Sequence, residues 1–463
     1  MRTASTAATN KPHSQVSIVG AGLAGCEAAW QLARRGLRVR LIDLKPVSMS
    51  PAHRQETLAE LVCSNSLRAK SISNAVGLLK EEMRRLGSLV MSAADRTRVP
   101  AGGALAVDRN LFSGTITHFM NSHPLVKIES RCVESVPRDN DAIIATGPLT
   151  SGTLASDIEN LSDGCLYYFD AIAPVVLADS MDMSKMFRQS RYEKGDTETG
   201  DYINAPMDEK QYTRFITALR TAERVQPASF ETGRFFEGCL PIEEMAERGF
   251  LAPAYGPMKP VGLTDPRTGK RPFAVVQMRS EDAEGTAYNM VGFQTRLKHS
   301  EQKKIFSMIP GLENAHFERL GQVHRNTYLN APSILGPGLE FKPVPRVLVA
   351  GQLAGVEGYI ESAACGLAAG IFMSDRIKGK GTTSLPPDTT ALGGLLKHLR
   401  IETENFQPSN VIWSMIAPLP GLKGSKKDKR MKRAQHALNE IEKWKIHIGA
   451  DDLQLPEASG FLE

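Results

Sequence analysis

Two cysteines stand in settings that suit chemistry better than packing. Cys239 lies in the loop-like segment FFEGCLPIEE, and Cys63 lies in ELVCSNSLRA, between an apolar Leu-Val pair and small polar residues. Cys26 and Cys365 instead fall in apolar, helix-like stretches, where a thiol acts as a small hydrophobic group. Cys63 and Cys239 are therefore candidate nucleophiles or bases, although either motif taken alone also fits a structural cysteine.

A cation near Cys63 would favour its reactive form. The thiolate, and not the thiol, attacks carbon or removes a proton. Arg68 follows Cys63 within the same segment and would stabilise a thiolate if the loop turns it inward. The sequence does not rank the two thiols.

A glycine-rich turn near the N-terminus predicts a dinucleotide site. The apolar run QVSIVG leads into AGLAG and a helix-like stretch, and LRVRLID follows as a second strand. The glycines form G-x-G-x-x-G, which lets the chain turn tightly, approach a pyrophosphate and pack its helix on the sheet. A carboxylate at the end of the second strand can accept hydrogen bonds from a ribose. The residues predicted for this site are Gly20, Ala21, Gly22, Leu23, Ala24, Gly25 and Asp43.

A second unit far downstream favours FAD over NAD. Residues 346–370, RVLVAGQLAGVEGYIESAACGLAAG, read as a strand, a glycine-rich turn and a small-residue helix. Two-domain flavoproteins use such a returning unit to present backbone N–H groups to the flavin end of FAD.

These two units frame the predicted domain organisation. A chain of 463 residues is long enough for two or three domains. The strand, turn, helix and strand order predicts a parallel, doubly wound sheet, whereas the central region mixes strands with loops. We expect an α/β two-domain flavoprotein. Its predicted parts are a flexible tail at 1–14, a Rossmann-like FAD-binding domain at 15–165 and 341–463 that ends in a basic helix, and an inserted mixed α/β domain at 166–340.

The composition is that of a soluble protein. The chain is 41% hydrophobic and 23% charged, and it contains no apolar run of the roughly 18 residues that a membrane span needs. The polar first fourteen residues do not resemble a signal peptide. The six cysteines form no C-x-x-C pair and show no regular spacing, which argues against a zinc site and a disulfide framework. We expect a cytoplasmic protein without a metal.

A cluster of cations near the C-terminus suggests a polyanionic partner. Residues 423–433, KGSKKDKRMKR, hold seven cations and one acid, on a chain of formal net charge +5. The predicted RNA contacts are Lys426, Lys427, Lys429 and Arg430. A solvated helix start explains such a run equally well.

Several motifs, in the order in which they occur, resemble the folate- and FAD-dependent tRNA uracil-5-methyltransferases, the TrmFO family. They are ELVCSNSLRA, PAGGALAVDR, FEGCLPIE, YGPMKPVGLTDPRTG, YNMVGFQT, MIPGLENA, HRNTYLNAP, AGQLAGVEGYIESAA and ENFQPSN. The resemblance runs from about residue 15 to about residue 440, and the two cysteine motifs are specific to the family.

This resemblance implies a reaction. A one-carbon unit from 5,10-methylenetetrahydrofolate would become the 5-methyl group of the T-loop uridine 54 of tRNA, with FADH2 as reductant and NADH or NADPH as the electron donor. C5 of uracil is a poor nucleophile until a thiolate adds to C6, so a cysteine is needed, and the methylene must be reduced, so a flavin hydride is needed. The implied partners are the T-arm of tRNA and folate, with no membrane and no obligatory protein partner evident.

The resemblance also implies residue roles. Cys239 would add to C6, and Cys63 would be the base that removes the C5 proton. The residues implied at the flavin are Gly351, Gln352, Glu357, Gly358 and Tyr359. The residues implied at the folate or uridine pocket are Arg68, His324, Arg325 and Asn326, of which the last three could instead tie the inserted domain to the sheet.

Three other functions stay open at this point. A ribosomal RNA uridine could be the target of the same chemistry. A small-molecule flavin oxidoreductase would need neither Cys239 nor the basic segment, and a non-catalytic RNA-binding flavoprotein would form no 5-methyluridine.

Overall fold

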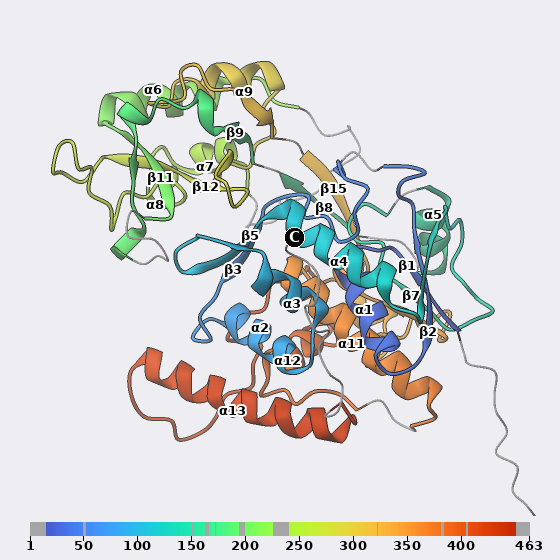
Figure 1. Cartoon of the computed structure of the whole chain (residues 1–463). Helices are drawn as coiled ribbons and strands as arrows, with labels where there is room; N and C mark the ends of the chain where they lie inside the picture. Colours follow the sequence, from blue (N-terminus) through green and yellow to red (C-terminus); the bar gives the residue numbers. More distant parts are fainter. Residues whose placement is uncertain are drawn as a thin grey trace, which may run out of the picture.

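The structure is a computed structural model, and its two parts are built on separate sheets (Figure 1). It describes residues 15–49, 52–150, 152–162, 166–171, 173–193, 200–225, 240–321, 323–380, 384–403 and 406–450. Cys239 and the predicted tail at 1–14 lie outside the described residues.

The larger part contains a parallel sheet. Its strands, in spatial order, are β16 (Val347–Val349), β7 (Ala142–Ile144), β1 (Gln15–Val19), β2 (Arg38–Asp43) and β6 (Val126–Ser130). Ile18 of β1 pairs with Leu41 of β2 on one side and with Ile143 of β7 on the other. The strands β1, β7 and β16 are buried along their length except at Gln15, as expected for a sheet that is covered on both faces. The sequence segment after residue 346 thus returns to the first nucleotide unit.

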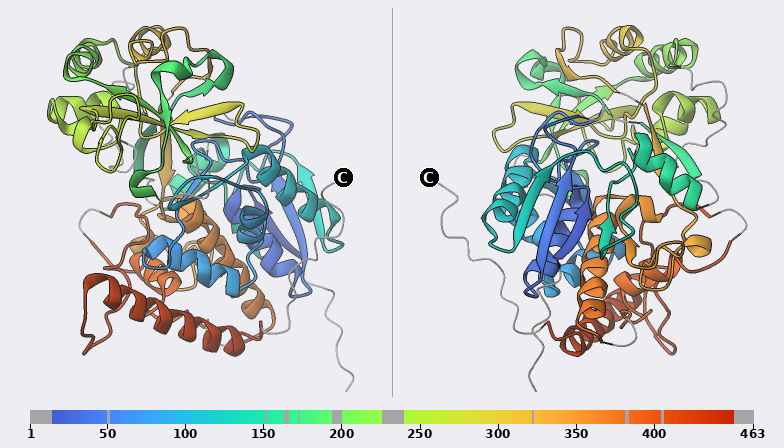
Figure 2. Two further views of the ribbon diagram at one scale, coloured as in Figure 1. Left: turned by 60° about the vertical axis from the view of Figure 1, so that its left-hand side comes forward. Right: turned by 90° about the vertical axis from the view of Figure 1, so that its right-hand side faces the viewer.

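Helices surround this sheet. They are α1 (Leu23–Ala33), α2 (Ala75–Arg85), α3 (Leu89–Arg96), α4 (Arg109–Ser122), α5 (Gly152–Leu161), α10 (Ala331–Ile334), α11 (Tyr359–Ile377), α12 (Ala391–His398) and α13 (Lys426–His447). Asp108 caps α4 by accepting hydrogen bonds from the amides of Asn110 and Leu111, and Ser425 caps α13 in a capping box with Asp428. In both views of Figure 2, α13 lies at the end of the molecule opposite the inserted part.

The inserted part has an antiparallel sheet of its own. The strand order is β10 (Phe187–Arg188), β11 (Tyr202–Met207), β12 (Ala274–Ser280), β13 (Ala287–Met290), β9 (Val175–Leu177) and β14 (Phe317–Arg319). Its helices are α6 (Glu209–Thr221), α7 (Ile242–Arg248), α8 (Ala252–Tyr255) and α9 (His299–Phe306). Phe215, Phe293 and Phe306 are fully buried in its core, which is separate from that of the larger part.

The chain passes between the two parts along a pair of strands. β8 (Leu166–Ala171) leads into the inserted part and pairs, antiparallel, with β15 (Val323–Tyr328), which leads back. Tyr328, Leu329 and Phe341 already pack in the core of the larger part. That core therefore resumes before residue 340, where the sequence predicted the domain boundary.

A small antiparallel sheet begins within ELVCSNSLRA, residues 60–69, which we call the Cys63 segment. Its strands are β3 (Ser66–Ala69), β5 (Ala104–Val107) and β4 (Arg98–Val99) in spatial order.

Within the described ranges, no helix combines the length and the apolar character that a membrane span requires. No group of three or more His, Cys, Asp or Glu side chains among these residues could hold a metal ion.

Candidate active site

The first glycine turn leaves space in front of a helix. Gly20 has a φ of +99°, and a Cβ there would lie 2.5 Å from the carbonyl oxygen of Ala145, so only glycine fits. At Gly22, the N-cap of α1, a Cβ would meet nothing within 4 Å. The open space at the helix N-terminus suits a phosphate group, because backbone N–H groups point into it.

Asp43 lies beside this turn at the end of β2. Its Oδ2 accepts a hydrogen bond from the amide of Ala21 at 2.6 Å, and its Oδ1 accepts one from the amide of Lys45 at 2.9 Å. A cavity of 610 Å³ opens next to it, with Gly20, Asp43 and Thr146 in its wall. The size and the carboxylate fit the adenosine half of a dinucleotide, and the contact of Asp43 with a ribose stays a prediction.

The second glycine turn lies against the first. Gly351 and Gly358 have φ values of +74° and +104°, and α11 begins directly afterwards at Tyr359. A Cβ on Gly351 would lie 2.8 Å from the Cβ of Ala24 in α1. The two turns expected at the two ends of FAD are therefore neighbours in space.

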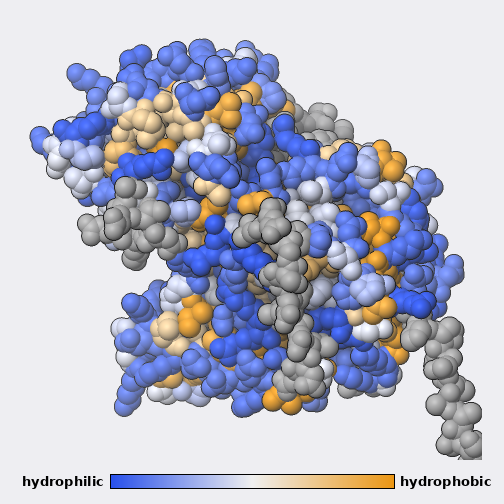
Figure 3. All heavy atoms as spheres, in the orientation of Figure 1, coloured by the Kyte–Doolittle hydropathy of each residue, from blue (hydrophilic) through white to orange (hydrophobic). Residues whose placement is uncertain are grey.

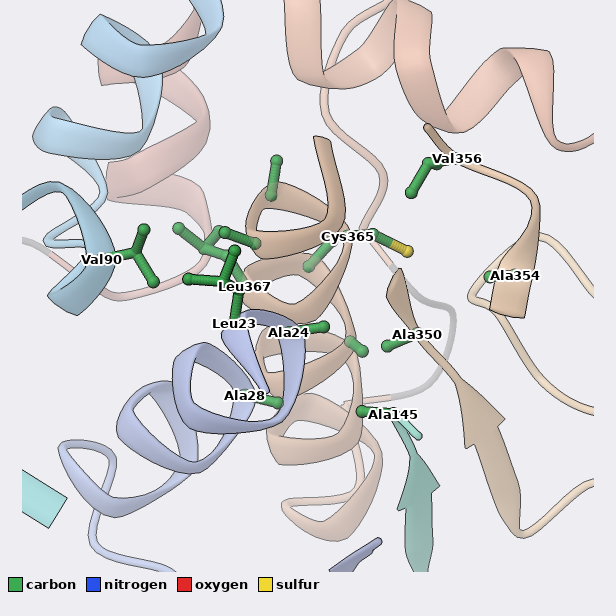
Figure 4. Close-up of a cluster of buried hydrophobic side chains, with 14 of the residues drawn as sticks. Leu23, Ala24, Ala28, Val90, Ala145, Ala350, Ala354, Val356, Cys365 and Leu367 are labelled. Carbon is green, nitrogen blue, oxygen red and sulfur yellow. The ribbon is translucent and has the colours of Figure 1, made fainter. Parts of the chain in front are cut away.

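Close packing of α11 on α1 causes this proximity. A Cβ on Gly366 would lie 2.1 Å from the carbonyl oxygen of Ala24, and one on Gly370 would lie 2.8 Å from that of Ala28. Figure 4 shows Ala24 and Ala28 of α1 facing α11, with Ala145 and Ala350 close by. The small residues of the downstream helix thus let the backbones approach.

Polar contacts close the second turn from within. Gln352 donates a hydrogen bond from Nε2 to Glu357 Oε2 at 2.6 Å. Asn410, from the ENFQPSN motif, donates to the carbonyl oxygen of Glu357 at 2.6 Å. The contacts of Gln352, Glu357 and Gly358 with a flavin stay predictions.

The Cys63 segment is attached to the start of α11. The hydroxyl oxygen of Tyr359 accepts hydrogen bonds from the amides of Cys63 at 2.7 Å and Ser64 at 3.2 Å. Burial, followed by the nearby Cys63, raises the pKa of the Tyr359 hydroxyl, so this group is neutral at physiological pH. The residue expected at the flavin is therefore also the residue that holds the backbone of Cys63.

Two arginines hold the same segment from other elements. Arg319, at the end of β14, donates to the carbonyl oxygens of Val62 at 3.0 Å and Cys63 at 3.1 Å. Arg109, at the start of α4, donates to the carbonyl oxygen of Leu61. Both guanidinium groups interact electrostatically with Cys63. Sequence reasoning missed them, although Arg109 ends the PAGGALAVDR motif.

Arg68, expected to act on Cys63, pairs with another group. Its Nη1 lies 2.8 Å from Oε1 of the buried Glu361 in α11. Burial raises the pKa of Glu361 and Arg68 opposes the shift. Lys80, buried in α2, donates to the carbonyl oxygens of Leu67 at 2.6 Å and Arg68 at 3.3 Å. The far end of the Cys63 segment is thus fixed to both α11 and α2, and the place of Arg68 in a substrate pocket stays a prediction.

The HRNTY motif falls on the strand that leads back from the inserted part. In β15, His324 pairs with Asp170, Arg325 with Phe169 and Asn326 with Tyr168 of β8. Asn326 is buried, and the side chains of His324 and Arg325 lie outside the described residues. For these three residues, a place in a substrate pocket and a role in joining the inserted part to the sheet both stay predictions.

The basic segment, residues 423–433, includes the first turns of α13, which begins at Lys426. Lys426, Lys427 and Lys429 are exposed there, while the Arg430 guanidinium lies 6.0 Å from the centre of the Trp413 ring. Arg433 has a structural contact, since it donates to the carbonyl oxygen of Trp413 at 3.1 Å. The exposed lysines remain available to a polyanion.

The chain is similar in sequence, over most of its length, to proteins of known name. The family model described as "Glucose inhibited division protein A" matches residues 15–381. A protein of Geotalea daltonii named methylenetetrahydrofolate–tRNA-(uracil-5-)-methyltransferase TrmFO is 54% identical over 433 residues, which cover 93% of this chain and 98% of the relative. The protein of the same name from Geobacter sulfurreducens is 54% identical over 430 residues, with 93% and 98% covered. This chain belongs to the TrmFO family.

Solved structures agree on the fold of this TrmFO family member. GidA of Aquifex aeolicus, in its form II crystal, superimposes with a TM-score of 0.70 at 16% identity, over 94% of this chain and 74% of GidA. At that identity the likeness shows the fold alone. The expected α/β class is confirmed, with a Rossmann-like parallel sheet and a separate sheet in the inserted part.

Proposed function

We propose that this chain forms 5-methyluridine at the T-loop uridine 54 of tRNA. The carbon would come from 5,10-methylenetetrahydrofolate, and the electrons would come from NADH or NADPH through FAD. Family membership supports the proposal, since the relatives are named methylenetetrahydrofolate–tRNA-(uracil-5-)-methyltransferases. We infer that the protein acts in the cytoplasm and needs no obligatory protein partner.

The two glycine turns would hold the cofactor. The space before the N-terminus of α1 fits a pyrophosphate, and the cavity beside Asp43 fits the adenosine. The turn from Gly351 to Gly358 would face the flavin. Reduced FAD, when bound there, supplies the hydride that converts the transferred methylene to a methyl group.

The observation that carries the proposal is the hydrogen bond from Cys63 to Tyr359. It attaches the backbone of a cysteine in a family-specific motif to the first residue after the flavin turn, with 2.7 Å between the amide nitrogen of Cys63 and the Tyr359 hydroxyl oxygen. A base at that place can act on a carbon that is being methylated next to the cofactor.

Each thiol would have one task. The Cys239 thiolate adds to C6, which makes C5 nucleophilic toward the one-carbon unit. Cys63 then removes the proton from C5, and the electron pair of the broken C5–H bond breaks the bond between the one-carbon unit and the nitrogen that carried it, which leaves a methylene doubly bonded to C5. Hydride from the reduced FAD that the site would hold turns this methylene into the methyl group, and the electron pair that returns to the ring re-forms the C5–C6 double bond and expels Cys239 from C6. Cys63 becomes a thiol when it takes the C5 proton and loses its proton to solvent afterwards. Cys239 lies outside the described residues, so its part rests on the FEGCLPIE motif.

A direct assay tests this function. Purified protein with an unmodified tRNA transcript, methylenetetrahydrofolate and NADPH or NADH should form 5-methyluridine, measured by nucleoside mass spectrometry. Omitting the folate should abolish the product. A transcript with cytidine at position 54 is the matched control. Product on ribosomal RNA and none on tRNA would move the proposal to the other RNA, and no product on either would refute it.

A further inference from the structure

The inserted part reaches across to hold the Cys63 segment. Arg319 of β14 donates through Nη1 to the carbonyl oxygen of Val62 and through Nη2 to that of Cys63. These two bonds fix consecutive peptide groups, so they define the direction in which the Cys63 side chain leaves the backbone. The partners are 256 and 257 positions apart in the sequence.

Other residues of the inserted part hold the next positions of the segment. Arg279 of β12 donates to Ser64 Oγ at 2.8 Å and to Asn65 Oδ1 at 3.0 Å. Glu281 accepts hydrogen bonds from Arg109 at 2.6 and 2.9 Å, and Arg109 in turn reaches Leu61. The segment is therefore held by hydrogen bonds at every residue from Leu61 to Asn65. We call the residues that hold it, Arg109, Arg279, Glu281 and Arg319, the clamp.

The clamp carries more positive than negative charge. Its cations are Arg109, Arg279 and Arg319, and the carboxylate paired with them among the described residues is Glu281. The Nε atom of Arg319 is buried and has no hydrogen-bond partner among the described residues. Burial, followed by the nearby Arg109, lowers the pKa of Arg319, whereas the burial of Arg109 is outweighed by Glu281 and Tyr359, which raise the pKa of Arg109. An anion at this place would be stabilised, and the groups near it that can become anionic are Cys63 and the neutral Tyr359.

We propose that Arg319 is a positioning residue for Cys63. From the inserted part it orients the backbone of Cys63, and together with Arg109 it stabilises the thiolate that accepts the C5 proton. This inference rests on the proposed function for the role of Cys63, and the contacts of Arg319 stand independently of it. A consequence is that Cys63 is a competent base only while the inserted part is seated on the FAD-binding part.

Alkylation of Cys63 tests the proposal without any turnover. The rate of modification by iodoacetamide is measured against pH in FAD-loaded protein that carries Cys239→Ala, and peptide mass spectrometry separates Cys63 from the other thiols. Cys132 is exposed but lines the cavity assigned to the adenosine, so it serves as the internal control among samples that are matched in flavin content. Arg109, Arg319 and Tyr359 interact with Cys63 and could shape its profile. Arg279, which binds Ser64, and Glu281, which pairs with Arg109, could do so indirectly.

Arg319→Gln should move the pH midpoint of Cys63 alkylation upward by about one unit, which makes the reaction about tenfold slower on the acidic side and equal at high pH. Arg319→Lys keeps the charge and should restore most of the midpoint. Arg267→Gln is the control, because Arg267 pairs with Asp265 at 2.8 Å within the inserted part. Cys132 should react alike in all variants.

An unchanged midpoint in Arg319→Gln, or a change of rate by one factor at every pH, would overturn the proposal, since a purely structural contact alters access and not ionisation. If Arg319→Gln fails to fold, the same comparison is made with Arg319→Lys, for which a midpoint moved as far as one unit would contradict the role of charge. If the wild type forms no 5-methyluridine in the direct assay, the proposed function is refuted, and the alkylation measurement still tests the contact between Arg319 and Cys63.

Discussion

At the scale of single residues, Gly22 is the sharpest test of the cofactor site. A Cβ at this position meets nothing within 4 Å, so the protein itself tolerates a larger side chain. The isopropyl group of Gly22→Val would occupy the space that a pyrophosphate needs at the N-terminus of α1. We expect a folded and colourless protein, as measured by circular dichroism and by flavin absorbance per protein.

Gly114→Val provides the matched control. Gly114 lies within α4 and also has open space around its Cβ position, but it does not face the glycine turns. This variant should keep its flavin. A fully flavinylated Gly22→Val variant would mean that the cofactor is misplaced.

A local motif predicts which residues come together, and their contacts with a cofactor stay predictions. Gly20, Gly22 and Asp43 come together as the pattern of strand and turn requires. Arg319 escaped prediction because its hydrogen bonds join parts of the chain 256 and 257 positions apart, and no local spacing encodes such a contact. Arg68 was expected at Cys63 on proximity in sequence, whereas the buried Glu361 takes its guanidinium group.

At the scale of elements, α2 places an ionisable residue under the Cys63 segment. Burial lowers the pKa of the Lys80 ammonium to about 7, against an ordinary value of 10.5. The unfolded chain therefore binds more protons than the folded one between these values, and stability should rise with pH there. Relative to Lys80→Met, the wild type should gain up to about 1.4 kcal/mol in unfolding free energy per pH unit above 7. Urea unfolding at several pH values measures this.

Glu82, on the same helix, should behave in the opposite way. Burial raises the pKa of its carboxyl group to about 8, although the amides of Ala391 and Leu392 donate to it. The folded protein then binds the extra proton, so stability falls as pH rises from about 4.5 to about 8. Glu82→Gln should remove this slope. Equal pH slopes in both variants and the wild type would contradict the two assignments.

The exposed start of α13 is expected to contact RNA phosphates. Replacing Lys426, Lys427, Lys429 and Arg430 by glutamine should weaken tRNA binding and reduce its salt dependence by about one unit of slope per lost contact. Filter binding over a range of salt concentrations measures both quantities.

A control on the same helix separates RNA contact from helix stability. Lys443 pairs with Glu440 at 2.7 Å, so Lys443→Gln removes one exposed charge from the other end of α13. It should leave affinity and slope nearly unchanged. If the variant with all four cations replaced by glutamine also binds tRNA with the affinity and salt dependence of the wild type, the segment is only a solvated helix start.

Elements differed in how far the sequence could predict them. The sequence predicted α11 as a small-residue helix after a glycine turn, and in the structure Gly366 and Gly370 of this helix lie against α1. The antiparallel strand order of the inserted part was not predictable, because β9 pairs with both β13 and β14 across long loops. Tyr328, at the end of the short strand β15, packs in the core of the larger part, and the sequence of so short a strand does not indicate which core it joins. The predicted domain bounds stay a prediction.

At the scale of the whole molecule, the predicted contacts with RNA lie far apart. The basic helix α13 is at the end of the larger part, opposite the inserted part, and the Cys63 segment lies where the two parts meet (Figures 1 and 2). On the face shown in Figure 3, hydrophilic side chains predominate and the outline is hollowed between the two parts. A folded RNA that reaches from α13 to Cys63 could satisfy both contacts, and a free nucleotide could not.

The central claim is that two thiols divide the reaction between them, and trapping with 5-fluorouridine tests it most directly. Fluorine at C5 cannot leave as a proton does, so a T-loop RNA with 5-fluorouridine should remain covalently bound to the enzyme once a thiolate has added to C6. The adduct is measured by denaturing gel electrophoresis and by mass spectrometry of the cross-linked peptide.

We expect an adduct in the wild type, none in Cys239→Ala, and an adduct without methylation of ordinary RNA in Cys63→Ala, with FAD retained in all three. An adduct that persists in Cys239→Ala and disappears in Cys63→Ala would mean that the two roles are exchanged. An adduct in both variants would contradict the account, because another group would then attack the ring.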